Sequence, residues 1–317
     1  MAYGIGTLLK AGGDDCHYQL LGVIKTLAEA NGWVTLRYVN TGADRELILK
    51  GEGLSGLEEI YIGFKTYQNS SLDYYNINCG VFVGYVSGST FETQPGARFS
   101  GMPAHNNAIT YFINVNPQRI VGCLKVATPV YEHFYLGRFF PYSKPGEYPA
   151  PLVCGSMFNG AEAKRFSDTN HIFPYSGYTS STTFNNMYNR NQAGAWVRPN
   201  CYPFTQGNVS GSNTNLAGWM VPADVYYQIE PIIIQQNDPT FSQSNLWGEL
   251  DGVYHCTGFN NGVENVIQVD GSSVVDQTGM TVLQAVDAII AVDGRALVML
   301  QNVNRTTFAD YIALEMK

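Results

Sequence analysis

The spacing of apolar residues changes once near the start of the chain. Over residues 14–28 apolar side chains recur every three to four positions, which predicts an amphipathic helix. Asp14 and Asp15 suit the positive end of the helix dipole, and Asn31-Gly32 predicts the end of the helix. Beyond Gly32 the period becomes two, which is typical of β-strands. Strands are predicted at 34–38, 47–49, 59–64, 78–86, 109–115, 120–126 and 130–140.

The clearest predicted hairpin joins 109–115 to 120–126 across Asn116-Pro117-Gln118-Arg119. Residues 1–140 therefore predict a helix followed by an antiparallel sheet region. Prolines from Pro141 to Pro151 then interrupt any ladder, because proline lacks a backbone N–H. Residues 141–223 have no sustained period and are rich in Pro, Asn, Ser, Gly and Tyr. We expect an irregular insertion that serves as an inter-subunit arm. The alternative is a subdomain that folds back onto its own subunit.

Strand signals return in residues 224–317, which we expect to form an acidic, β-rich C-terminal region. The predicted strands are 225–229, 232–234, short runs from 246 onward, and a last strand at 311–314. Turns are predicted at Asp251-Gly252, Asn261-Gly262, Asp270-Gly271 and Asp293-Gly294. The fold class predicted for the whole chain is mainly β (α+β), with antiparallel meander or sandwich-like sheets, one N-terminal helix and a long irregular insertion.

Charge is scarce in this chain and unevenly distributed. Only 14% of the 317 residues are charged, against about 25% in an average domain. The net charge is −8, with 3 basic and 12 acidic residues in 224–317 and only two arginines, without any acid, in 169–223. Because no basic patch is visible, we expect no nucleic-acid partner. Few charges and 13% aromatic residues are typical of surfaces that are completed by neighbouring subunits.

The six cysteines are widely scattered: Cys16, Cys79, Cys123, Cys154, Cys201 and Cys256. Residues 1–10 carry neither a basic nor an apolar segment of the kind that opens a signal peptide. We therefore expect free thiols in an intracellular or virion-type protein. The longest apolar runs are short, so we also expect no membrane-spanning segment and no membrane partner.

Motifs for cofactors and metals are weak. Residues 51–56 match G-x-G-x-x-G, but a dinucleotide site needs a helix at the third glycine, and the following residues predict a strand. We interpret this motif as a turn. The adjacent pairs Cys16-His17 and His255-Cys256 would point to opposite faces of a strand and chelate poorly. No cofactor or metal ligand is predicted.

The sequence evidence for a set of catalytic residues is also weak, and no catalytic residue is predicted. The chain contains five histidines and no G-x-S-x-G nucleophile motif. Glu132-His133 lies in the strand-like run 130–140, where an inward glutamate would be notable for acid–base chemistry. We expect a solvent-facing or edge position for Glu132.

A pattern of aromatic, glycine and proline residues resembles a group of virion structural proteins of tailed bacteriophages. The residues that carry it are Tyr111-Phe112-Ile113, 119–126, Tyr131, Tyr135-Leu136-Gly137, Pro141-Tyr142, Pro145, 148–152, 246–254 and 301–306. The resemblance covers most of the chain and is least clear over 160–215. It includes no catalytic signature.

The resemblance implies a non-enzymatic virion structural protein, in a tail or baseplate, that assembles in several symmetric copies. Its expected partners are other copies of itself and tail tube, sheath or baseplate proteins, in the virion and, during assembly, in the host cytoplasm. One alternative is a receptor- or carbohydrate-binding tail module with Trp196 and Tyr202 as stacking platforms. A second alternative is a tail-tip cell-wall hydrolase.

Overall fold

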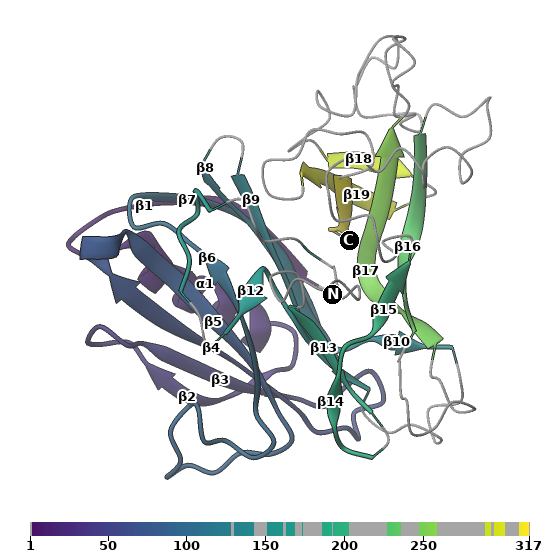
Figure 1. Ribbon diagram of the computed structural model, residues 1–317, viewed down its shortest axis with the longest axis horizontal. Helices are drawn as coiled ribbons and strands as arrows, with labels where there is room; N and C mark the ends of the chain where they lie inside the picture. The colour runs from purple at the N-terminus through teal and green to yellow at the C-terminus, as the bar shows by residue number, and fades with distance from the viewer. Residues whose placement is uncertain are drawn as a thin grey trace.

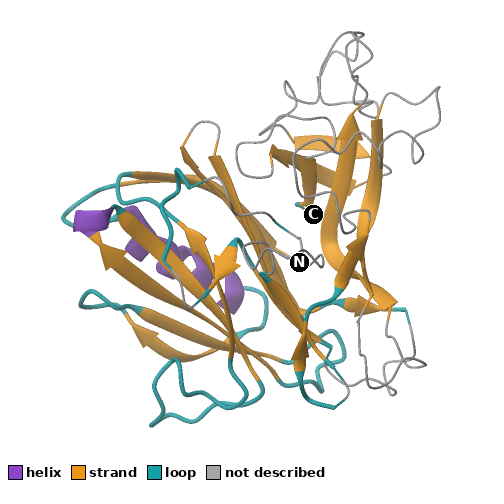
Figure 2. Cartoon of the chain, in the orientation of Figure 1, coloured by secondary structure: helices purple, strands orange, loops and turns teal. Residues whose placement is uncertain are grey.

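The structure is mainly β, with three antiparallel sheets and one α-helix near the N-terminus, which confirms the predicted fold class (Figures 1 and 2). It is a computed structural model. The residues it describes are 2–127, 130–142, 151–160, 163–168, 173, 186–191, 193–202, 227–235, 247–258, 289–292, 295–301 and 311–316.

The first sheet has seven strands in the order β1-β7-β8-β9-β11-β13-β14. These strands are β1 (Ala2–Leu9), β7 (Ala108–Asn116), β8 (Arg119–Ala127), β9 (Val130–Arg138), β11 (Leu152–Gly155), β13 (Met187–Arg190) and β14 (Trp196–Val197). The second sheet has six strands in the order β12-β6-β5-β4-β3-β2. They are β12 (Phe158–Asn159), β6 (Arg98–Pro103), β5 (Tyr74–Phe82), β4 (Ile60–Asn69), β3 (Glu46–Gly51) and β2 (Val34–Val39), with the 3₁₀ turn η1 (Ser70–Leu72) between β4 and β5.

The third sheet runs β15-β16-β17-β20-β19-β18, and β10 also pairs with β17. Its strands are β15 (Asn200–Tyr202), β16 (Tyr227–Gln235), β17 (Trp247–Gly258), β20 (Tyr311–Glu315), β19 (Arg295–Gln301), β18 (Ile289–Val292) and β10 (Phe140–Pro141). This sheet lies against the first one, where β17 contacts β8 and β19 contacts β9. The first sheet therefore packs against a different sheet on each face.

The main core lies between the first and second sheets. Strands β9 and β11 pack against β4, β5 and β6, and the rings of Phe64 and Phe134 meet edge to face with centroids 5.7 Å apart. Helix α1 (Cys16–Glu29) contacts strands of both sheets, including β1, β7, β2 and β3. It buries Leu20, Leu21 and Ile24, the apolar stripe that the sequence pattern predicts.

The predicted helix and the predicted hairpin are confirmed. Asp15 occupies the N-cap position of α1, and Gly32, which follows the helix, has a φ of 84°. In the β7–β8 hairpin the Asn116 side-chain oxygen accepts the backbone N–H groups of Gln118 and Arg119, both at 3.0 Å. This local bonding explains why the turn could be predicted from nearby residues alone.

Several strand predictions need correction. The strand expected at 78–86 is β5, which ends at Phe82 because the chain then leaves the sheet. The described residues 227–229 of the first run and the run 232–234 belong to a single strand, β16, with an irregular register after Pro231. Asp251-Gly252, expected as a turn between strands, lies inside β17 at that irregularity, where Gly252 has a φ of 76°. Asn261-Gly262, Asp270-Gly271 and Asp293-Gly294 lie outside the described residues.

The region 141–223 contributes more to the sheets than the sequence predicted. Its described strands β11, β12, β13, β14 and β15 pair with β9, β6, β11, β13 and β16 of the same chain. Each of them has only two to four residues, too few to show a period. The expected arm is thereby limited to the rest of this region, most of which lies outside the described residues. Within the part of the chain that the structure describes, no helix is both long and apolar enough to cross a membrane.

Candidate assembly surface

Among the described residues, strand β1 forms one edge of the first sheet and pairs only with β7. The pairing places Ile5 opposite Phe112 and Thr7 opposite Thr110, and just beyond the strand the Lys10 N–H donates to Asn107 O at 2.8 Å. In an antiparallel ladder, alternate residues direct their backbone groups toward the partner. The even-numbered residues of β1 therefore bond to β7, and the odd-numbered residues direct their N–H and C=O groups outward.

The odd-numbered residues also present an exposed apolar row. Tyr3 is 49% exposed, Ile5 38% and Leu9 63%. Thr7 lies between them, and its hydroxyl is 3.0 Å from that of Thr110 on β7. On the opposite face of β1, Gly4 and Gly6 leave room for the Tyr111 ring. The sequence of β1 thus separates a packed inner face from an open outer face.

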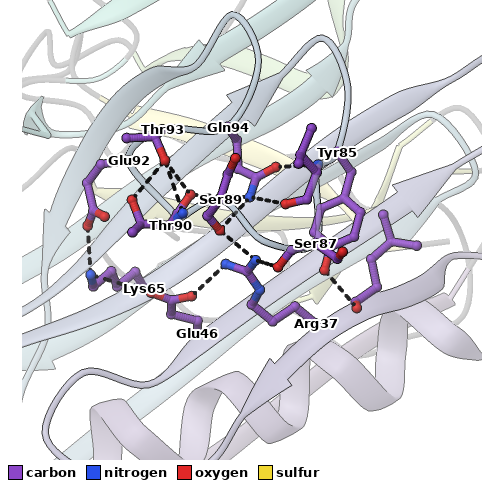
Figure 3. A network of polar contacts seen from close by, with 12 residues as sticks. Arg37, Glu46, Lys65, Tyr85, Ser87, Ser89, Thr90, Glu92, Thr93 and Gln94 are labelled. Carbon is purple, nitrogen blue, oxygen red and sulfur yellow. Dashed lines mark hydrogen bonds and ion pairs between the residues drawn. The ribbon is translucent and has the colours of Figure 1, made fainter.

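The corresponding edge of the second sheet is covered. Strand β2 has a register shift between Thr35 and Arg37, and the loop of residues 83–97 folds over it (Figure 3). The Tyr85 hydroxyl donates to the edge carbonyl of Leu36 at 3.3 Å. Arg37 donates to the loop carbonyls of Ser87 and Ser89 at 2.8 and 2.7 Å. A bulge, a charged residue and a covering loop are the devices that keep sheet edges from pairing with other chains.

Within the part of the chain that the structure describes, strand β1 shows none of these devices. Its pairing with β7 is unbroken in register from Ala2 to Leu9, and the strand contains no charged residue. The nearest charged side chain after β1 is that of Lys10, which pairs with Asp15 at 2.7 Å. With eight residues β1 is also longer than β2, which has six. The described residues therefore leave this edge open to a further strand.

The surroundings of Glu132 contradict its predicted position. Glu132 is fully buried on β9, an interior strand between β8 and β11, and is neither solvent-facing nor at an edge. The reason is that both faces of the first sheet are covered, which the sequence of one strand does not reveal.

The neighbouring residue His133 lies beside Cys123, a pairing that the sequence did not suggest. Its Nε2 atom lies 3.6 Å from Cys123 Sγ on β8, because these two residues are register partners. A thiol beside an imidazole can act as a nucleophile and its base. Both side chains are fully buried and the His133 ring stacks on Phe173, so this pair has no opening to a substrate among the described residues.

Other candidates lie apart from one another. The motif at 51–56 forms the turn between β3 and β4, as expected, and no helix begins there. Cys16 and His17 are both buried in α1. Trp196 is half-buried and donates its Nε1 hydrogen to Gly96 O at 2.9 Å, while the side chain of Tyr202 lies outside the described residues. The described residues contain no group of three or more His, Cys, Asp or Glu that could hold a metal ion.

A pocket of about 330 Å³ opens beside the 83–97 loop. Its lining includes the rings of Phe91 and Phe99, whose centroids are 5.6 Å apart, and the amide of Asn78. The Asn78 side-chain oxygen is buried without a hydrogen-bond partner. Glu92 also lines the pocket and accepts a hydrogen bond from Lys65 at 2.6 Å. Burial has the largest single effect and would raise the pKa of Glu92, but the hydrogen bond and charge of Lys65, with hydrogen bonds from the Glu92 backbone and Thr90, together lower the pKa.

No protein-family model matches this chain, and no curated protein is similar to it in sequence.

Proposed function

We propose that this chain is a non-enzymatic structural subunit of a tailed-bacteriophage virion, placed in the tail or baseplate and present in several symmetric copies. The observation that carries the proposal is the open, uncharged edge strand β1 with its exposed apolar row. An edge of this kind is a liability for an isolated protein and is useful for a subunit that is completed by its neighbours. The resemblance of the sequence to virion structural proteins supports the same conclusion.

Purified particles test this proposal. Particles from the source culture would be separated on a density gradient, and their proteins quantified by mass spectrometry. We expect this chain to co-purify with major virion proteins at many copies per particle, and antibodies against it to label one defined part of the particle. A chain that stays in the free protein fraction, with no label on particles, would overturn the proposal.

The pocket beside the 83–97 loop favours a second candidate, a carbohydrate-binding tail module. The half-buried ring of Phe99 offers a stacking surface and the unpaired amide oxygen of Asn78 a hydrogen-bond acceptor, two kinds of group that sugar rings bind. Saturation-transfer NMR with methyl glycosides of common hexoses would detect such binding. Ala97→Trp should fill the pocket and abolish the signal, whereas Tyr67→Ala, which removes a 37%-exposed ring that does not line the pocket, should not. No saturation transfer from any glycoside to the parent protein would reject this candidate.

The third candidate, a cell-wall hydrolase, is tested by a zymogram with embedded peptidoglycan. We expect no clearing, because the sequence contains no acid pair or nucleophile–base motif. Clearing that disappears in Glu132→Gln or Cys123→Ala would identify an enzyme and would refute the non-enzymatic assignment.

A further inference from the structure

We propose that β1 pairs with β1 of a second copy of this chain, antiparallel and about a two-fold axis, with Ile5 opposite Ile5 of the partner subunit. The proposal deepens the proposed function, because it names the partner of the same surface and the register of the contact. The two first sheets would join edge to edge into one continuous sheet.

The backbone groups available for pairing define the extent of the contact. The odd-numbered residues of β1 direct their N–H and C=O groups away from β7, as the register and the Lys10–Asn107 bond establish. The Leu9 carbonyl is already used, because Gln19 Nε2 donates to it at 2.9 Å. The groups open to a partner strand are therefore mainly those of Tyr3, Ile5 and Thr7.

Only one two-fold register uses all of these groups. With Ile5 on the axis, Tyr3 faces Thr7 of the partner subunit and each N–H meets a C=O. A shift by two residues toward the C-terminus would place Tyr3 opposite Leu9 of the partner subunit, whose carbonyl is occupied. On the packed face of the sheet, the central register brings Gly4 opposite Gly6 of the partner subunit, so no side chains collide there. On the open face it sets the apolar Ile5 side chains next to each other.

The charge of the chain favours a second copy as the occupant of this edge. Each copy carries a net charge of −8, so two copies repel except where the meeting surfaces are free of acidic groups. Strand β1 satisfies this condition along its whole length. A two-fold contact is also self-complementary: the groups on one strand are those that the other strand requires.

The size of the contact predicts a weak dimer. Stable interfaces bury about 1,200–2,000 Å² in total, which a single pair of eight-residue strands does not reach alone. We therefore expect reversible association of the purified protein at high concentration. In a particle, further contacts of each copy would raise the effective concentration and make the pairing persistent.

Disulfide trapping tests the register. Ile5→Cys places two thiols on the axis, where hydrogen-bonded antiparallel partners have Cα atoms about 5.5 Å apart, within the range of a disulfide. Val34→Cys is the matched control, because Val34 is 51% exposed at the covered edge of the second sheet. The five native cysteines described are all buried and contribute little background. Mild oxidation should convert Ile5→Cys to a covalent dimer and leave Val34→Cys monomeric. Equal dimer yields from the two variants would overturn the proposal.

Thr7→Pro tests the backbone pairing separately. The Thr7 N–H faces away from β7, so proline removes a donor of the proposed contact but none of the β1–β7 ladder. Sedimentation velocity should show loss of the concentration-dependent dimer, and circular dichroism should show a retained fold. Ile5→Lys should have the same effect because it places like charges on the axis. A folded variant of either kind that dimerises as the parent does would contradict the pairing.

The two proposals can fail independently. A chain found in particles whose Ile5→Cys variant does not crosslink refutes the β1 pairing and leaves the structural role intact. Efficient crosslinking by a chain that is absent from particles supports the pairing and refutes the role in the virion.

Discussion

The guanidinium group of Arg119 donates through Nε to the backbone carbonyl of Asp251 at 2.9 Å and lies 3.3 Å from its carboxylate. Arg119 begins β8 of the first sheet and is fully buried, whereas Asp251 belongs to β17 of the third sheet. The Asp251 carboxylate also accepts hydrogen bonds from Asn116 at 2.6 Å and Gln118 at 2.9 Å. The β7–β8 hairpin of the first sheet thus binds the bulge of β17 through hydrogen bonds and holds the third sheet against the first.

Replacing Asp251 should destabilise this contact strongly. Asp251→Ala leaves the buried Arg119 charge without its counter-ion, a change that costs about 3 kcal/mol or more. We expect a lower midpoint of urea unfolding, measured by tryptophan fluorescence. Glu59→Ala is the control, because Glu59 pairs with Lys50 but is 65% exposed, and such pairs contribute at most about 1 kcal/mol. Similar midpoints for the two variants would show that the Arg119–Asp251 contact does not hold the sheets together.

His17 should make the protein less stable in mild acid. Burial lowers the pKa of this histidine from 6.5 to about 4, and neither ring nitrogen has a hydrogen-bond partner. Between these two pKa values the unfolded state binds the proton more readily, so stability is complete above about pH 6.5 and falls as the pH decreases toward 4. The loss is on the order of 3 kcal/mol.

The variant His17→Phe tests this pH dependence. Phenylalanine retains the ring contacts with Tyr18 and Tyr75 but cannot be protonated. Urea unfolding of both proteins should give a stability difference that grows in favour of the variant as the pH falls from 6.5 to 4. If the two curves stay parallel over this range, the histidine is not the group responsible.

Gly137 on β9 cannot accept a side chain. Its φ is 120°, and a Cβ atom there would meet the backbone carbonyl of Gln118. We expect Gly137→Ala to lose about 2 kcal/mol or more of unfolding free energy, because strain and a clash with rigid backbone add together. Gly88→Ala, where a Cβ meets nothing within 4 Å, should change the thermal midpoint little. A Gly137→Ala protein as stable as Gly88→Ala would disprove this account.

The cysteines should be unreactive in the folded protein and free after unfolding. Five of the six are free and buried, and burial raises the pKa of Cys154 to about 12. Since the thiolate is the reactive form, these five should not react with Ellman's reagent at pH 8 in minutes. In denaturant without reductant, all six should react, including Cys256, whose side chain lies outside the described residues. A shortfall of two thiols would reveal a disulfide and contradict the expectation.

The features that the sequence predicted correctly are those that near neighbours determine. Helix α1 follows from the spacing of Leu20, Leu21 and Ile24, and the β7–β8 turn follows from Asn116, which bonds to residues two and three positions ahead. The turn at residues 51–56 was likewise predicted because the glycines and the following strand lie side by side in the chain. Periodicity and turn chemistry act over a few residues, and they were sufficient to predict elements of that length.

Features that depend on distant partners were decided by the tertiary structure. Glu132 is buried because separate sheets cover both faces of its strand. Asp251 lies in a bulge, where a turn was expected, because the register between β16 and β17 shifts there, and this position lets its backbone carbonyl accept a hydrogen bond from Arg119. The candidate site was hidden for the same reason. The residues 2–9 show little strand signal, and only pairing with β7, 103 positions away at Thr7–Thr110, makes them an edge. The sequence by itself determined that this chain forms antiparallel sheets with little charge, whereas which edge stays open depends on long-range pairing that no local pattern encodes.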